Sequence, residues 1–357
     1  MPLWTDIIDP IEATAAARVE LAEYERQNSL AKYLPTIGVD GDTVEVFSTD
    51  DGLVSEANFR AWNAPPEIGD SQAISSTIVK LPAISRNEPI DEKTQRALKR
   101  LPEDRVKRSI EAAIRRNVWA TGDALERTRG ALIQTGKVAN PWQKNFKLNE
   151  DFGRDAALTL DAGVSGYWSN ADVDRIGQLQ DWIALWKTYN TGQELGAILV
   201  SDQSFAGYAR GKQFATLLPN GGSRTASKQD VMDISSAEGF APFDIYNRST
   251  KSGRVLDPKY IYLMPAPVAP DGDTPSLLGA TYTGETLTAD AAGFESVADG
   301  DPRGMVCGVY KEDRIPYTVE VMSDAVALPV AQKANAVLAV KVCLLYTSPS
   351  PRDLSTS

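Results

Sequence analysis

Apolar residues recur at helical spacing over residues 102–134, the longest stretch of this kind in the chain. The stripe they form consists of Val106, Ile110, Ile114, Val118, Leu125 and Leu132. Acidic residues at Glu103 and Asp104 suit the positive end of a helix dipole, and Gly136 offers a stop. The pattern predicts one helix roughly 50 Å long, because each residue adds about 1.5 Å. Such a rod suits a flat, elongated subunit better than a closed enzyme core.

A second helix is predicted before it, over residues 9–30, which are rich in Ala and Glu. Its apolar face is thin and consists of Ile11, Ala15, Val19 and Ala22. A stripe this thin cannot form a core alone. We expect an arm that rests on something larger, either its own chain or a neighbour.

Residues 38–82 contain no helical pattern. Val44 and Val46 alternate with polar residues, a turn signal follows at residues 49–52, and extended runs are predicted at 53–62 and 74–81. A hairpin of this size is marginal alone in water, and a long insertion usually serves a function. We expect this segment to lie across another subunit, although packing of its aromatic residues on the chain's own sheet is equally compatible with the pattern.

The remainder mixes helices and strands and ends in strands. Residues 156–160 suggest a strand, and a capping-box-like start at 169–172 precedes a helix with Leu179 and Trp186 on its apolar side. Residues 197–201 resemble a buried strand, and residues 280–288 are a hairpin candidate. The order of elements predicts an α+β fold without repeats.

The chain has 357 residues and no histidine, which removes the commonest general base and the commonest metal ligand. Two cysteines, Cys307 and Cys343, are too few for a disulfide framework or a thiolate zinc site. The N-terminus carries acids where a signal peptide needs bases, and no run is long enough to cross a bilayer. These features predict a protein made in reducing cytoplasm or in a particle assembled there.

The net charge of −11 argues against general adhesion to nucleic acid. Residues 91–116 are locally basic, with nine Lys or Arg against five Asp or Glu. A nucleic-acid patch is one interpretation, but the interleaved acids favour a solvated or ion-paired helix face.

No motif supports catalysis, and we predict no catalytic residue, cofactor or metal ligand. Residues 207–212 lack the spacing and the Ser or Thr of a phosphate loop. The Asp-Gly-Asp runs at 271–273 and 299–301 lack the continuation of an EF-hand. A carboxylate pair cannot be located by sequence, so a carboxylate-dependent hydrolase stays as an alternative without support.

Several short motifs, taken in order, resemble the major capsid protein E family of lambda-like tailed bacteriophages over residues 1–342. The motifs are LVSEANFRAW at 53–62, KLP at 80–82, the long helix, DFGR at 151–154, VLDP at 255–258, LG at 278–279, PYTV at 316–319 and ALPV at 327–330. Each is weak alone, but their order and spacing together are fairly specific.

The resemblance implies a Hong Kong 97-like capsid fold. The expected parts are an N-terminal arm (1–35), an extended loop region (36–82), a peripheral domain with the spine helix (83–170), an axial domain (171–300) and return strands of the peripheral domain (301–342). The candidate contacts between subunits are Phe59, Arg60, Trp62 and Ile68. No cross-linking Lys–Asn pair is identifiable.

The implied function is a major capsid protein that self-assembles into the icosahedral shell enclosing phage double-stranded DNA. Its expected partners are copies of itself as hexamers and pentamers, scaffold and portal proteins, decoration proteins, and packaged DNA held without sequence specificity, with no membrane. Its expected location is the virion, assembled in the host bacterial cytoplasm. Another virion component, from the tail or the decoration, is the nearer alternative.

The last fifteen residues, 343–357, have no core pattern. They resemble a translated sequencing adapter, and we expect them to lie outside the fold.

Overall fold

The computed structural model describes residues 8–49, 74–90, 92–98, 103–140, 146–218, 224–270, 272, 274–291, 294, 303–311 and 318–343. The chain divides into two compact units. Unit 1 comprises residues 1–132, 137–152 and 267–334, and unit 2 comprises 133–136, 153–266 and 335–357.

Unit 1 is built around the long strand β15 (Val319–Ala331). The first half of β15 lies between β14 (Val306–Lys311) and β4 (Ala83–Ile90), and its second half pairs with β13 (Gly279–Gly284). β13 pairs on its other side with β1 (Thr36–Gly38), in parallel. The predicted hairpin at residues 280–288 is therefore wrong, because β13 finds its partners far away along the chain rather than in the residues that follow it.

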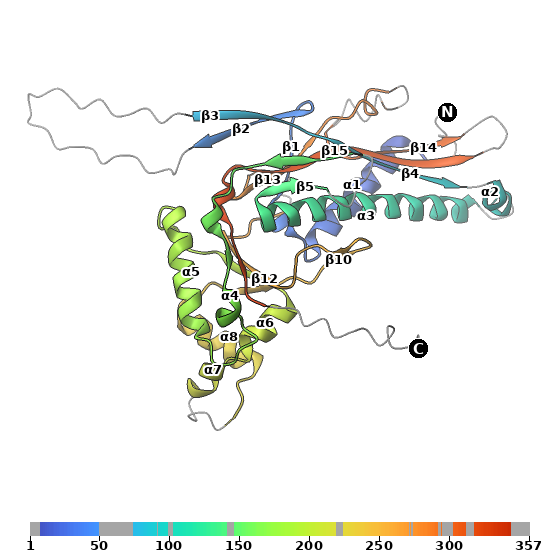
Figure 1. Ribbon diagram of the computed structural model, residues 1–357. Coiled ribbons are helices and arrows are strands. Elements are labelled where there is room, and N and C mark those ends of the chain that lie inside the picture. Colours follow the sequence, from blue (N-terminus) through green and yellow to red (C-terminus); the bar gives the residue numbers. More distant parts are fainter. Residues whose placement is uncertain are drawn as a thin grey trace, which may run out of the picture. The chain divides into compact units, whose positions relative to one another are not determined.

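The predicted long helix is present as α3 (Glu103–Thr135) and lies along this sheet (Figure 1). Its apolar stripe is buried as expected, with Ile110, Ile114, Val118, Leu125 and Leu132 at most 3% exposed. Each such side chain contributes about 1.5–3 kcal/mol by leaving water. The helix ends at Thr135, and Gly136 follows it with a positive φ of 72°, which suits a C-terminal cap.

The N-terminal helix is present as α1 (Pro10–Arg26), capped by Asp9, whose side chain accepts from Ile11 N. The predicted buried face is wrong. Ile11 and Val19 are 45% and 62% exposed, whereas Ala13 and Ala17 enter the core with α3, β14 and β15. The hydroxyl of Thr14 determines which face of α1 is turned towards β14, because it donates to Cys307 O and accepts from Cys307 N. α1 thus rests on its own chain.

Unit 1 also contains η1 (Leu30–Lys32), α2 (Glu92–Leu98), and the antiparallel strands β5 (Lys137–Ala139) and β6 (Asn149–Asp151), which pair with each other.

Unit 2 contains a sheet with the strand order β7-β16-β12-β8-β9. The strands are β7 (Thr159–Asp161), β8 (Ala197–Val200), β9 (Phe243–Ile245), β12 (Tyr260–Met264) and β16 (Leu338–Lys341). β8 is fully buried, as its apolar run predicts. A short ribbon of β10 (Ser249–Thr250) and β11 (Gly253–Arg254) also belongs to this unit.

The helices of unit 2 are α4 (Gly163–Gly166), α5 (Arg175–Tyr189), α6 (Asp202–Ala209), α7 (Lys212–Thr216) and α8 (Lys228–Ala237). Two local predictions are wrong here. The strand predicted over residues 156–160 begins only at Thr159, as β7, because residues 156–158 form the 3₁₀ turn η2 that Asp155 caps. Asp174 rather than residues 169–172 caps α5. The prediction that residues 343–357 lie outside the fold is wrong for Cys343, which is buried beyond β16 and whose N donates to Lys259 O at 3.3 Å. Residues 344–357 lie outside the described residues.

Candidate functional site at the base of the β2–β3 ribbon

A ribbon of two antiparallel strands leaves unit 1 at the predicted extended loop. β2 (Thr43–Thr49) and β3 (Ile74–Lys80) pair in register from Thr43↔Lys80 to Thr49↔Ile74. Among the described residues, neither strand pairs with any other strand. An isolated ribbon of this kind is marginal in water, so its base needs support from the rest of the chain.

Backbone hydrogen bonds tie the base of the ribbon to β13. Val39 N donates to Thr283 O at 2.8 Å, and Glu285 N donates to Gly41 O at 3.1 Å. Gly284 permits this close approach, because a Cβ there would lie 2.2 Å from Gly41 O. The path of the ribbon is therefore fixed where it leaves the sheet.

A cluster of buried charged side chains lies next to the base of the ribbon. Arg129 of α3 is fully buried, and its Nη2 contacts Glu25 Oε1 of α1 at 2.5 Å and Thr36 Oγ1 of β1 at 2.8 Å. Its Nε donates to Thr281 Oγ1 of β13 at 2.8 Å. One side chain thus joins α1, α3, β1 and β13.

The cluster holds a second carboxylate, Glu126, which is also fully buried. It accepts from Ser29 Oγ at 2.6 Å and from Leu30 N at 2.8 Å, and it lies 3.7 Å from Arg129 Nη1. Burial opposes the charge on Arg129, but the attraction of Glu25 and Glu126 outweighs it, so the pKa of Arg129 is raised. The guanidinium stays charged, and the turn between α1 and β1 is held to the long helix.

Helices α1 and α3 run in parallel, as a row of polar contacts shows. Lys107 of α3 pairs with Glu12 of α1 at 2.6 Å, and Arg115 of α3 pairs with Glu20 of α1 at 3.3 Å, so residue numbers increase in the same direction along both helices. Farther on, Tyr24 OH hydrogen-bonds Asp123. The Tyr24 ring crosses α3 at Gly122, where a Cβ would lie 2.6 Å from the ring. Because the glycine has no side chain, the two helices approach closely at this point.

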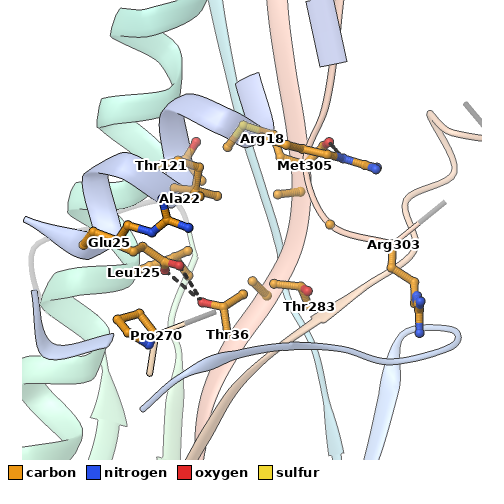
Figure 2. Close-up of a pocket in the computed structure, with 15 residues that line it drawn as sticks. Arg18, Ala22, Glu25, Thr36, Thr121, Leu125, Pro270, Thr283, Arg303 and Met305 are labelled. Atoms are coloured by element: carbon orange, nitrogen blue, oxygen red, sulfur yellow. Dashed lines mark hydrogen bonds between the residues drawn. The ribbon is translucent and has the colours of Figure 1, made fainter. Parts of the chain in front are cut away.

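A cavity of about 410 Å³ adjoins the cluster, between α1, α3 and the sheet (Figure 2). Its lining includes Leu21, Ala22, Leu125, Met305 and Ala325 as apolar members and Arg18, Arg26 and Arg303 as cations. Arg18 Nε donates to Met305 O at 3.0 Å. The side chain of Arg303 lies over Gly38 at the end of β1, so the cavity reaches the base of the ribbon.

The candidate contacts Phe59, Arg60, Trp62 and Ile68 lie outside the described residues. Within the described residues, no group of His, Cys, Asp or Glu could hold a metal ion. No helix of the described part is long and apolar enough to span a membrane.

Comparison with known proteins identifies the family. A family model described as phage major capsid protein E matches residues 29–202, which include the base of the ribbon and all of α3. This match places residues 29–202 in the phage major capsid protein E family. Its role is to form a shell, and its family is a structural one rather than a family of enzymes. No curated protein matches the chain in sequence.

Two solved structures share the fold of this capsid protein. A prophage protein of E. coli CFT073, assigned as a capsid protein, has a TM-score of 0.58 at 12% identity, covering 92% of this chain and 99% of that one. A phage-related protein from Bordetella bronchiseptica RB50 has a TM-score of 0.52 at 13% identity, covering 95% and 98%. The predicted Hong Kong 97-like α+β fold is confirmed.

In this capsid protein the cluster joins α1, α3, β1 and β13 beside the base of the ribbon. Glu25 and Glu126 are engaged by Arg129, Thr36, Ser29 and Leu30 N. The sequence does not reveal the cluster, because an arginine near the C-terminal end of a helix is expected there for its interaction with the helix dipole alone. Arg129 and Glu25 are separated by 104 residues, so no local pattern relates them.

Proposed function

We propose that the capsid protein assembles as hexamers and pentamers into the icosahedral shell that encloses phage double-stranded DNA. The observation that supports this most is the family match over residues 29–202, together with a ribbon that finds no further strand partner in the described part of the chain. Repeated contacts of modest area, closed around rings, can build such a shell.

In this proposal α3 is the spine helix of the peripheral domain, which comprises residues 83–170 and 301–342. The axial domain near the five- and six-fold positions comprises residues 171–300, most of which belong to unit 2. The segment between β2 and β3, which contains Phe59, Arg60, Trp62 and Ile68, overlaps an adjacent subunit. Scaffold, portal and decoration proteins are the further partners, and packaged DNA meets the inner face without sequence specificity. Assembly takes place in the host bacterial cytoplasm.

Replacement of residues 50–73 by an Asn-Gly turn tests the role of the segment. Because Thr49 and Ile74 are register partners, a short turn can close the ribbon without changing its pairing. We expect a folded, soluble subunit that forms no shells in electron microscopy. A Gly-Ser segment of equal length is the matched control for chain length.

Loss of folding in the Asn-Gly variant would place residues 50–73 in the chain's own core. Shells from the Gly-Ser variant would show that the side chains of the segment are dispensable. Either result contradicts the proposed role of the segment.

Assembly should also depend on ionic strength. The start of α3 is basic while the chain as a whole is acidic, so contacts between subunits would bring opposite charges together. Salt at about 1 M shortens the screening length to about 3 Å and should weaken assembly. Equal shell yields by light scattering in low and high salt would contradict this.

A further inference from the structure

The first half of α3 carries a stripe of arginines on its outward face. Residues three or four positions apart share one face of a helix, and the exposed positions of this face follow that spacing. They are Arg105, Arg108, Arg115 and Arg116, with the half-buried Ala112 between them. The stripe lies opposite the buried side chains of Ile110 and Ile114. It is roughly 16 Å long, because each helical residue adds about 1.5 Å.

Two arginines of the stripe have carboxylate partners on their own chain. Arg115 pairs with Glu20 of α1, and Arg116 pairs with Glu88 of β4. The two arginine side chains nevertheless remain 56% and 53% exposed. Solvent-exposed pairs of this kind contribute little free energy, so a stronger anion can replace the carboxylate.

The one acidic residue among residues 105–116 does not share this face. Glu111 lies four residues after Lys107 and therefore on the same side of the helix as Lys107. A hydrogen bond with Glu12 and the charges of Glu12 and Glu111 raise the pKa of Lys107, so these three groups lie beside the stripe. Within the part of the chain that the structure describes, Arg105 and Arg108 form no ion pair. The fold thus separates charges that are mixed in the sequence.

Helix α2 extends the cationic surface at the start of α3. Figure 1 shows α2 next to this end of α3, and its residues Lys93 and Arg96 are exposed. Residues 91–116 carry nine Lys or Arg against five Asp or Glu, whereas the net charge of the chain is −11. A polyanion is therefore attracted to this end of α3 and repelled by the net charge of the remaining chain.

The side chains of the stripe favour a nucleic acid over a protein as the polyanion. The centre of a protein–protein interface is depleted of charged residues and contains apolar or aromatic anchors. Between Arg105 and Arg116 this face offers only Ala112 in that role. A DNA backbone needs no apolar anchor, because guanidinium groups bind phosphates through charge and paired hydrogen bonds. Each strand of a duplex carries a charge about every 3.4 Å along the axis, so a stripe of this length faces about five phosphates.

We propose that the arginine stripe of α3 binds the phosphate backbone of double-stranded DNA without sequence preference. Arg105 and Arg108 contact phosphates directly, and Arg115 and Arg116 exchange their carboxylate partners for phosphates. This inference rests on the proposed shell function, and it adds which surface of the subunit meets the packaged DNA.

Chemical footprinting maps the contact in the particle. Phenylglyoxal modifies exposed arginines, and it is applied to DNA-filled particles and to the same particles emptied of DNA. Mass spectrometry then gives the modification rate at each arginine. We expect Arg105 and Arg108 to react several-fold more slowly in filled particles, whereas Arg210, an exposed arginine of unit 2, keeps its rate. Equal rates at Arg105 and Arg108 in filled and emptied particles, or equal protection of Arg210, overturn the inference.

Duplex binding by the full chain, below its assembly concentration, is the second test. Fluorescence anisotropy follows a duplex of about 20 base pairs over a range of salt concentrations. At about 50 mM salt, Arg105→Gln with Arg108→Gln should weaken binding about ten-fold or more. The same variant should reduce the slope of log affinity against log salt by about 1.8, since each phosphate contact contributes about 0.9.

A matched control removes the same charge from another surface. Arg210→Gln with Lys228→Gln changes two exposed positions of unit 2 and should leave the salt slope unchanged. Equal effects of the two double variants, or no binding of the duplex by the unaltered chain at low salt, overturn the inference.

The proposed function and this inference fail differently. If the unaltered protein forms no shells, the proposed function is wrong, and the anisotropy result still decides whether the stripe binds DNA. If Arg105→Gln with Arg108→Gln forms no empty shells although its circular dichroism is unchanged, the stripe belongs to a contact between subunits, and only the inference is wrong.

Discussion

Replacing Arg129 with methionine should destabilise unit 1 strongly. The substitution leaves Glu25 and Glu126 buried without their cation, at 7% and 0% side-chain exposure. Removing one partner of a buried ion pair costs about 3–5 kcal/mol, because the remaining charge stays desolvated. That is a large share of the total stability of about 5–15 kcal/mol that is typical of a domain.

Cys307 supplies an assay that is specific for unit 1. Its side chain is 1% exposed, and burial raises the pKa of its thiol to about 12, so it reacts with thiol reagents only after opening. In a Cys343→Ser background, the labelling rate of Cys307 follows the population of the open form when closing is fast. We expect Arg129→Met to increase that rate roughly 100- to 5,000-fold.

Two controls isolate the charge effect. Arg129→Met combined with Glu25→Gln and Glu126→Gln should restore most of the protection, because no buried charge remains unpaired. Lys107→Met breaks a solvent-exposed pair with Glu12 and should change the rate less than about five-fold. Unaltered protection in Arg129→Met, or a triple variant as labile as the single one, would refute the reasoning.

Three further predictions concern packing, a buried guanidinium and pH. Gly122→Ala should lower the stability of unit 1 by about 1–3 kcal/mol in the same labelling assay, because the alanine Cβ would meet the Tyr24 ring. This cost should exceed the gain from the better helix propensity of alanine. Unchanged or higher stability contradicts the prediction. Arg175→Met should lower the urea concentration at which unit 2 unfolds, because the carbonyls of Trp168, Asn170 and Tyr208 lose their donor. Tryptophan fluorescence in urea measures the midpoint, and an unchanged midpoint contradicts this. Hydrogen bonds from Lys341, Tyr167 and Gly163 N lower the pKa of Asp161 to about 2, and the bond to Asp161 raises the pKa of Lys341. The Asp161–Lys341 contact therefore stabilises β7 and β16 from about pH 4 to about pH 10.5, and that stability is lost as the pH falls towards 2 or rises well above 10.5. Hydrogen exchange of β16 should show both limits. Lys341→Met should abolish the alkaline limit and move the acidic limit to higher pH without removing it, because Tyr167 and Gly163 N still donate to Asp161; an unchanged alkaline limit contradicts this.

Elements with a strong local period could be predicted from the sequence, and their partners could not. The apolar residues from Ile110 to Leu132 recur with the period of an α-helix, and the same residues form the buried face of α3, so the sequence predicts both the helix and its buried face. For α1 the helix is predicted correctly, but alanines occupy several of its faces, and the tertiary contact of Thr14 with Cys307 decides which face is buried.

Long-range pairing explains the remaining errors. Thr36 of β1 pairs with Thr281 of β13. Turn residues indicate only which neighbouring strands can pair, so they cannot predict the register of two strands so far apart in the sequence. The short strand β4 has mostly exposed side chains, so its sequence shows no apolar alternation, and its pairing with β15 defines it. The inter-subunit residues Phe59, Arg60, Trp62 and Ile68 stay a prediction.

The continuity of β3 with β4 has a mechanical consequence for a filled shell. Only Leu81 and Pro82 separate the two strands, which follow one line in Figure 1, and β4 pairs with β15 over eight residues, from Ala83 to Ile90. Tension applied to the ribbon is thereby delivered along β4 as shear, which loads all the hydrogen bonds of that ladder at once instead of opening them one after another. Outward pressure on a filled shell would thus act along the β4–β15 pair rather than across it.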